Sequence, residues 1–118
     1  MVLVTFWVSW HRSAANETAH LKKLATRYGD KGFAILGVSL DDRRDELDAF
    51  LQAHPRSWPD LYDGKGFESP IALRTNTEQV PIALLIDQDG KIAELRLSLT
   101  DEAGMEQVEK AIQAALGS

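Results

Sequence analysis

Apolar and polar positions along this chain follow two different periods, which predicts a mixture of strands and helices. The run from Val2 to Trp7 carries no charged residue and is typical of a strand buried on both faces. A second run of the same kind covers Phe33–Leu40. Between these runs, apolar residues recur at helical spacing and predict a helix with one buried face, formed by Leu21, Leu24, Ala25 and Tyr28. Two buried strands joined by a helix form a βαβ unit with parallel strands and a right-handed crossover.

A second helix is predicted after the Phe33–Leu40 strand. Asp41 and Asp42 precede it and are typical capping residues for a helix N-terminus, and Pro55 ends it. Its inner face is predicted to consist of Leu47, Phe50, Leu51 and His54. The following segment, Trp58–Gly64, predicts a loop or a short extended piece.

The last third of the chain predicts a short helix, a β-hairpin and a final helix. The short helix is expected over 67–74, where Pro70 fits only the first turn. A strand over 82–87 leads into Asp89-Gly90, a hairpin signal, and into a returning strand with alternating polarity. The final helix is expected to be capped by Thr100 and to bury Met105, Val108, Ile112 and Leu116. This order of elements indicates an α/β fold.

Length and composition limit the classes of protein to consider. The chain has 118 residues, which suits a single domain over 1–118, either complete in itself or excised from a longer protein. Its net charge of −5 and the lack of a basic cluster argue against nucleic acid as a partner. No stretch reaches the roughly 18 consecutive apolar residues of a membrane span, and no targeting signal is visible. The chain contains no cysteine.

The residues after the first strand carry a motif that resembles a known active site. Trp7 is followed by Trp10 and then by Glu17, seven positions further on. This spacing resembles the active-site region of the TlpA-like thiol-disulfide oxidoreductases, a family of the thioredoxin-like superfamily that carries Trp-Cys-x-x-Cys-x-x-Glu-x-Pro. In this chain the Cys-x-x-Cys positions are occupied by His11, Arg12, Ser13 and Ala14. The Trp and Glu positions match, whereas both sulfur positions do not.

The resemblance implies a specific architecture. It implies a central four-stranded mixed sheet in the order 2-1-3-4, with helices on both faces, and a cis peptide bond at Val80-Pro81 opposite the motif. Relatives of this kind also carry strand structure before the position of Val2, which this chain lacks, so the edge along Phe33–Leu40 is expected to be open. We expect a second copy in a homodimer, or another segment of a parent protein, to cover that edge. The resemblance also implies an extracytoplasmic location.

The same motif argues against the reaction of the family. Thiol-disulfide exchange needs a thiolate and a second thiol to resolve the mixed disulfide, and His11 and Ala14 provide neither. We therefore predict a redox-inactive domain without a cofactor. A metal site is not predicted, because His11, His20 and His54 lack ligand spacing and have no cysteine to join them.

Three hypotheses for the function remain open. The first is a binding module that holds an extended peptide or protein segment in the former active-site groove, lined by Trp7, Trp10, His11, Arg12, Glu17, Val80 and Pro81. The second is a non-redox enzyme or a small-anion site that uses His11, Arg12 and Glu17, since a helix N-terminus attracts anions and disfavours a charged imidazolium. The third is a purely structural domain.

Overall fold

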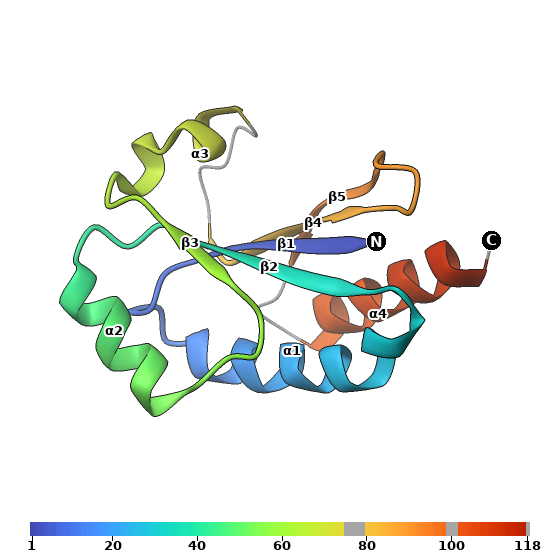
Figure 1. Ribbon diagram of the computed structural model, residues 1–118, viewed down its shortest axis with the longest axis horizontal. Coiled ribbons are helices and arrows are strands. Elements are labelled where there is room, and N and C mark those ends of the chain that lie inside the picture. The colour runs from blue at the N-terminus through green and yellow to red at the C-terminus, as the bar shows by residue number, and fades with distance from the viewer. Residues whose placement is uncertain (75–79, 99–101, 118) are drawn as a thin grey trace.

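The computed structural model describes residues 1–74, 80–98 and 102–117, and it shows a mixed sheet with helices on both faces (Figure 1). The predicted Thr100 cap lies outside the described residues. Within those residues, no helix has the length and apolar character needed to cross a membrane. The elements in chain order are β1 (Val2–Trp7), α1 (Ala14–Tyr28), β2 (Ala34–Ser39), α2 (Arg44–Ala53), β3 (Asp60–Tyr62), α3 (Pro70–Arg74), β4 (Ile82–Ile86), β5 (Ile92–Ser98) and α4 (Glu102–Gly117).

The sheet has the strand order β3-β2-β1-β4-β5. β1 runs parallel to β2 and antiparallel to β4, and β4 pairs antiparallel with β5. The α/β architecture expected from the sequence is confirmed, with a mixed sheet between helices. The four predicted strands keep their relative order, but the sheet as a whole has five strands.

The predicted number of four strands is wrong, because the structure adds β3 at one edge. β3 pairs in parallel with β2, joining Gly37 to Asp60 and Ser39 to Tyr62. The edge predicted to be open along Phe33–Leu40 is therefore covered by the chain itself over Gly37–Ser39. A strand of three residues contains too few positions to show a period, so the sequence predicted only a loop or a short extended piece here.

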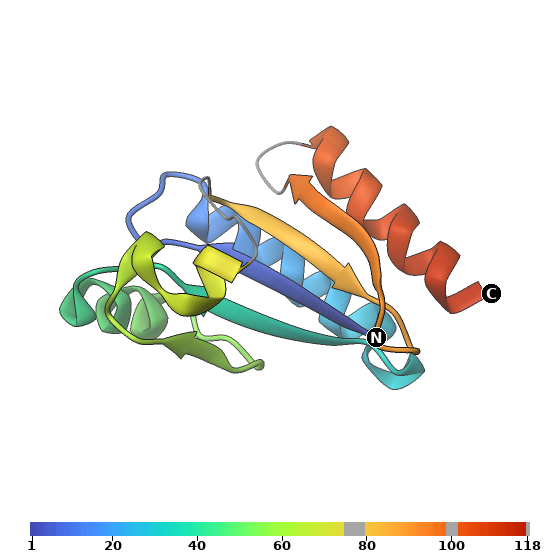
Figure 2. The same ribbon diagram turned by 90° about the horizontal axis from the view of Figure 1, so that it is seen from above.

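Two apolar layers hold the helices against the sheet. On one face, α1 and α4 cover strand residues such as Leu3 and Leu85, and both of these side chains are fully buried (Figures 1 and 2). α2 lies on the same side and packs around Trp7. The opposite face carries a second cluster that includes Phe6 and Val38, and α3 lies on that side. The helical stripe predicted for α1 is confirmed, since Leu21, Leu24 and Tyr28 are buried.

Asp41 does not cap α2, which corrects the sequence prediction. The residue before α2 is Arg43, and it makes no side-chain capping bond. Asp41 is instead fully buried, and its carboxylate accepts hydrogen bonds from the amide and hydroxyl of Ser9 and from the hydroxyl of Ser39. Buried carboxylates need such partners, so Asp41 ties the turn after β1 to the end of β2.

A buried ion pair anchors β3. Arg56 donates from Nη1 to Asp60 Oδ1 at 2.7 Å, and both side chains are almost completely buried. Asp60 Oδ1 also accepts from Nε1 of Trp7 at 3.0 Å. Arg56 Nη2 reaches Thr18 of α1 at 3.0 Å. The short edge strand is thus held by side chains as well as by its backbone.

We predict that Gly37→Ala destabilises the domain. A Cβ at this position would lie 1.7 Å from Asp60 Oδ1, so either β3 or the Arg56–Asp60 pair has to move. We expect a loss of about 2 kcal/mol or more in the free energy of unfolding, measured by urea denaturation. Gly29→Ala is the matched control, because Gly29 has a helical φ of −59° and no atom within 4 Å of the added Cβ. Equal stabilities of the two variants would contradict the prediction.

Candidate functional site

The candidate site begins where β1 leaves the sheet and turns into α1. The turn is closed by backbone hydrogen bonds, from the amide of His11 to the carbonyl of Val8 and from the amide of Ala14 to the carbonyl of His11. Ser13 is the residue before α1 and makes no side-chain bond to the helix backbone. The turn therefore presents the four residues of the former motif, His11 to Ala14, at the positive end of α1.

The peptide bond between Val80 and Pro81 is cis, as the sequence predicted. Phe6 pairs with Ile82 in the antiparallel register, so this bond lies at the same end of the sheet as the turn (Figure 2). Val80 packs against the apolar cluster that contains Val8, which belongs to the turn. The structure thus brings the two sequence matches, 7–17 and 80–81, to one place.

The seven predicted groove residues divide into a surface set and a buried set. Trp10 is 62% exposed, and Arg12 is exposed beside it. His11 and Val80 are half-buried. The remaining three, Trp7, Glu17 and Pro81, are buried. Only the first four residues are accessible to a ligand at this surface, because the other three are buried.

Trp7 illustrates this supporting role. Its indole packs against Phe50 with ring centroids 5.3 Å apart, and the Arg56 guanidinium lies 3.7 Å from the ring centroid. Its Nε1 donates to Asp60. With both its ring and its polar atom occupied, Trp7 fixes the end of β1 and does not offer a ligand surface.

His11 and Glu17 are linked through Ser13. The Ser13 hydroxyl lies 2.8 Å from His11 Nδ1 and 2.6 Å from Glu17 Oε2, within hydrogen-bond distance of both. The Ser13 amide also donates to His11 Nδ1, at 3.1 Å. The sequence placed Ser13 in the motif without assigning it this link, although residues 13 and 17 have the i, i+4 spacing of neighbours on a helix.

Burial raises the pKa of Glu17 to about 7, from an ordinary value of 4.5. The Ser13 hydroxyl and the positive charge of Arg56 act in the opposite direction and lower it, but desolvation is the larger effect. Only 2% of Glu17 is exposed. A carboxyl group with this pKa can accept or release a proton near neutral pH, which is the proton chemistry that the site offers.

Arg56 was not predicted as a site residue. An arginine between a helix and a short strand is expected to be solvated. Its spacing to Asp60 does not indicate a pairing, because i, i+4 neighbours meet on a helix and residues 56–60 are not helical. In the structure it contacts Trp7, Thr18 and Asp60 from beneath the turn.

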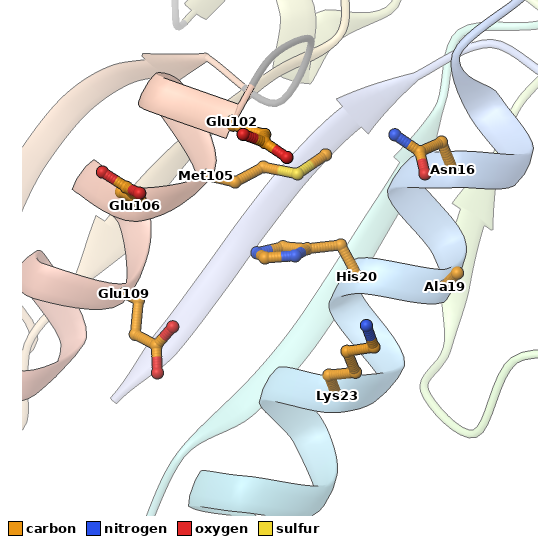
Figure 3. Close-up of a pocket in the computed structure, with 8 residues that line it drawn as sticks. All are labelled: Asn16, Ala19, His20, Lys23, Glu102, Met105, Glu106 and Glu109. Carbon is orange, nitrogen blue, oxygen red and sulfur yellow. The ribbon is translucent and has the colours of Figure 1, made fainter.

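A separate pocket of about 390 Å³ lies between α1 and α4, away from the turn (Figure 3). The His20 ring reaches from α1 toward Met105, and Nε2 of His20 is buried without a hydrogen-bond partner among the residues that the structure describes. Glu109 at the rim is engaged with Arg27 and with the hydroxyl of Tyr28. Over the ranges 1–74, 80–98 and 102–117, no three His, Asp or Glu side chains gather closely enough to hold a metal ion.

Comparison with known proteins agrees with this geometry. A family model described as thioredoxin-like matches residues 1–92. The chain is 27% identical over 109 residues to the thioredoxin-like protein YneN of Bacillus subtilis, covering 90% of this chain and 61% of that protein. It is also 27% identical over 112 residues to the thiol-disulfide oxidoreductase ResA of Bacillus cereus, covering 95% of this chain and 61% of ResA. The chain thus spans about three-fifths of the length of these relatives.

Solved structures show the same fold. A crystal structure assigned as a thiol:disulfide interchange protein DsbE from Chlorobium tepidum superposes with a TM-score of 0.86 at 28% identity, covering 98% of this chain and 79% of that one. A thiol-disulfide oxidoreductase from Bacteroides fragilis superposes with a TM-score of 0.77 at 29% identity, covering 92% of this chain and 79% of that one.

We predict that Glu17 makes the stability of the domain fall as the pH rises. Because its pKa is raised in the folded state, the stabilising contribution is fully present below about pH 4.5 and is lost as the pH rises through about 7. Relative to the wild type, Glu17→Gln should gain about 2 kcal/mol in the free energy of unfolding between pH 5 and pH 8. Urea denaturation at both pH values measures this difference. His20 is present in both proteins, so its own lowered pKa cancels from the comparison. A difference that does not change with pH would mean that Glu17 titrates near its ordinary value.

Proposed function

Because the chain belongs to the thioredoxin-like family and contains no cysteine, we propose that it is a redox-inactive domain that binds an extended segment of a partner protein at the turn before α1. The relatives are named as thiol-disulfide oxidoreductases, a reaction that requires a thiolate. His11 and Ala14 carry no sulfur, so they cannot take part in thiol-disulfide exchange. The surface around these two residues can still bind a ligand.

The exposure of Trp10 is the observation that carries the proposal. An indole with 62% of its surface in water loses unfavourable hydration when a ligand covers it. Tryptophan is also among the side chains that contribute most to protein–protein binding. Trp10 stands next to His11 and Arg12, which add hydrogen-bonding groups and a positive charge at the rim.

Val80 provides the second half of the proposed binding surface. It is half-buried against the cluster that contains Val8, and it directly precedes the buried Pro81. An extended ligand can pair with backbone groups at such a position in the manner of an added strand. The ligand would then lie between Val80 and Trp10, with side chains supplying specificity.

The arrangement of donors favours this function over the anion-binding alternative. The amide and the hydroxyl of Ser13 are already engaged with His11 and Glu17. Glu17 is buried, so it acts on the surface through Ser13 and does not contact a ligand directly. Arg12 is then left as the exposed cation of the turn, a weak basis for holding a small anion against solvent.

We predict that Trp10→Ala weakens binding of an extended chain. A thiol-free probe is reduced, carboxymethylated insulin B chain, titrated into ¹⁵N-labelled domain while amide shifts are recorded. The wild type should show shifts centred on Trp10, Arg12 and Val80, and Trp10→Ala should bind about tenfold or more weakly. Ile92→Ala is the matched control, because Ile92 is similarly exposed (57%) and begins β5. Shifts spread evenly over the surface, or equal affinity of all three proteins, would favour the structural-domain alternative.

We also predict that placing cysteines at the two former cysteine positions restores thiol-disulfide exchange. The wild type should show no turnover in an insulin-reduction assay with dithiothreitol. The double variant His11→Cys/Ala14→Cys should gain measurable turnover, because the helix N-terminus remains in place to favour the thiolate. The variant with His11→Cys alone serves as the control, since a single thiol cannot resolve the mixed disulfide. Turnover by the wild type would refute redox inactivity, whereas a silent double variant would show that the turn no longer has the geometry of an exchange site.

A further inference from the structure

The hydrogen bonds of the Ser13 hydroxyl depend on how protons are distributed among its neighbours. It has one proton to donate, and it lies within hydrogen-bond distance of two acceptors, His11 Nδ1 at 2.8 Å and Glu17 Oε2 at 2.6 Å. If both neighbours offer only lone pairs, one of these contacts brings two lone pairs together without a proton between them. A neutral imidazole with its proton on Nδ1 could donate to Ser13 Oγ and fill both contacts. With a lone pair on Nδ1 instead, both contacts are hydrogen bonds only when the three side chains carry one more proton.

The Ser13 amide shows where the extra proton belongs. It donates to His11 Nδ1 at 3.1 Å, which requires a lone pair on that nitrogen. A neutral imidazole with its proton on Nε2 satisfies this requirement, whereas an imidazolium does not. The extra proton then belongs to Glu17. A protonated Glu17 donates to Ser13 Oγ, and Ser13 Oγ in turn donates to His11 Nδ1, whose one lone pair is then shared by the hydroxyl and the amide of Ser13.

We propose that Glu17, Ser13 and His11 share one proton as a single unit, and that its loss turns the Ser13 hydroxyl toward Glu17 and releases His11. When the proton leaves to solvent, the carboxylate of Glu17 becomes an acceptor only. The Ser13 hydroxyl then donates to Glu17, and the imidazole of His11 keeps the amide bond alone. The device belongs to the free domain, so it holds whether or not a partner binds at the turn.

The surroundings of Glu17 place this event near neutral pH. Burial disfavours its charged form and raises the pKa of Glu17 to about 7. From the segment before β3, the Arg56 guanidinium faces Glu17 and favours the carboxylate. Arg56 is itself paired with Asp60 of β3, and it also interacts with Asp41 at the end of β2. Asp60 and Asp41 therefore offset part of the effect of Arg56 on the pKa of Glu17. The hydrogen bonds of Ser13 also affect this pKa.

The proposal predicts the direction in which His11 affects Glu17. In the wild type, ionising Glu17 costs the bond from Ser13 to His11. With His11→Phe, that cost is absent while the ring volume is largely kept, so the midpoint of the Glu17 titration should fall by about half to one pH unit. An imidazole acting only through its positive charge would give the opposite result, because removing a nearby cation raises the midpoint.

The test follows the side-chain carboxyl of Glu17 by ¹³C NMR in the full chain, from about pH 4 to pH 9. His11→Phe should lower the midpoint in the wild-type background but leave it unchanged in a Ser13→Ala background, since the hydroxyl is the link between the two groups. His54→Phe, at the end of α2, is the matched control and should not move the midpoint. A midpoint that rises or stays constant in His11→Phe, or that falls equally in both backgrounds, would overturn the proposal.

A second measurement covers the case in which a variant fails to fold. In Glu17→Gln, the side-chain amide can donate to Ser13 at every pH, which mimics the protonated carboxyl. The ¹⁵N shifts of the His11 ring should then lose the step that the wild type shows at the Glu17 midpoint. The same step in both proteins would show that His11 does not sense Glu17.

Discussion

A buried guanidinium joins the elements around the candidate site. Arg56 lies over the ring of Trp7 and bonds to Asp60 and Thr18, so one side chain joins β1, β3 and α1. Removing two charges from water is costly, and a buried pair is tolerated only when its geometry satisfies the polar atoms. Asp60 meets this condition with bonds from Arg56 and from Trp7, and Arg56 uses both terminal nitrogens, although its Nε is buried without a partner among the described residues. The turn at the start of α1 rests on this arrangement, which also supplies the positive charge that acts on Glu17.

Much of the fold could be predicted because buried strands and helices show regular patterns of apolar residues along the sequence. β1, β2 and β4 are apolar on both faces, and α1 and α4 bury one stripe, so their sequence patterns are long enough to identify. β3 could not be found in this way, since three residues define no period and its pairing depends on Arg56 and Asp60. Asp41 shows a second limit. An aspartate before a helix is a typical cap, but here the hydroxyls of Ser9 and Ser39 and the amide of Ser9 compete successfully for its carboxylate.

The candidate site was predictable in its location but not in its internal order. The motif of Trp7, Trp10 and Glu17, together with Val80-Pro81, carries a family resemblance, and that resemblance placed the turn beside the cis bond. The exposure of each residue could not be predicted. Trp7 and Trp10 are the same residue type three positions apart, yet Trp7 is buried and Trp10 is exposed. The link through Ser13 depends on side-chain orientations that no sequence spacing specifies.

The unequal burial of the tryptophans gives the domain a built-in optical reporter. Trp7 and Trp58 are enclosed by the core, whereas Trp10 stands in solvent on the turn. These are the three tryptophans of the chain, so a water-soluble quencher such as iodide reaches the fluorescence of one of them by preference. The emission of Trp7 is further set apart by the charged group stacked on its ring. Events at the turn can therefore be followed in the unlabelled protein, separately from the integrity of its interior.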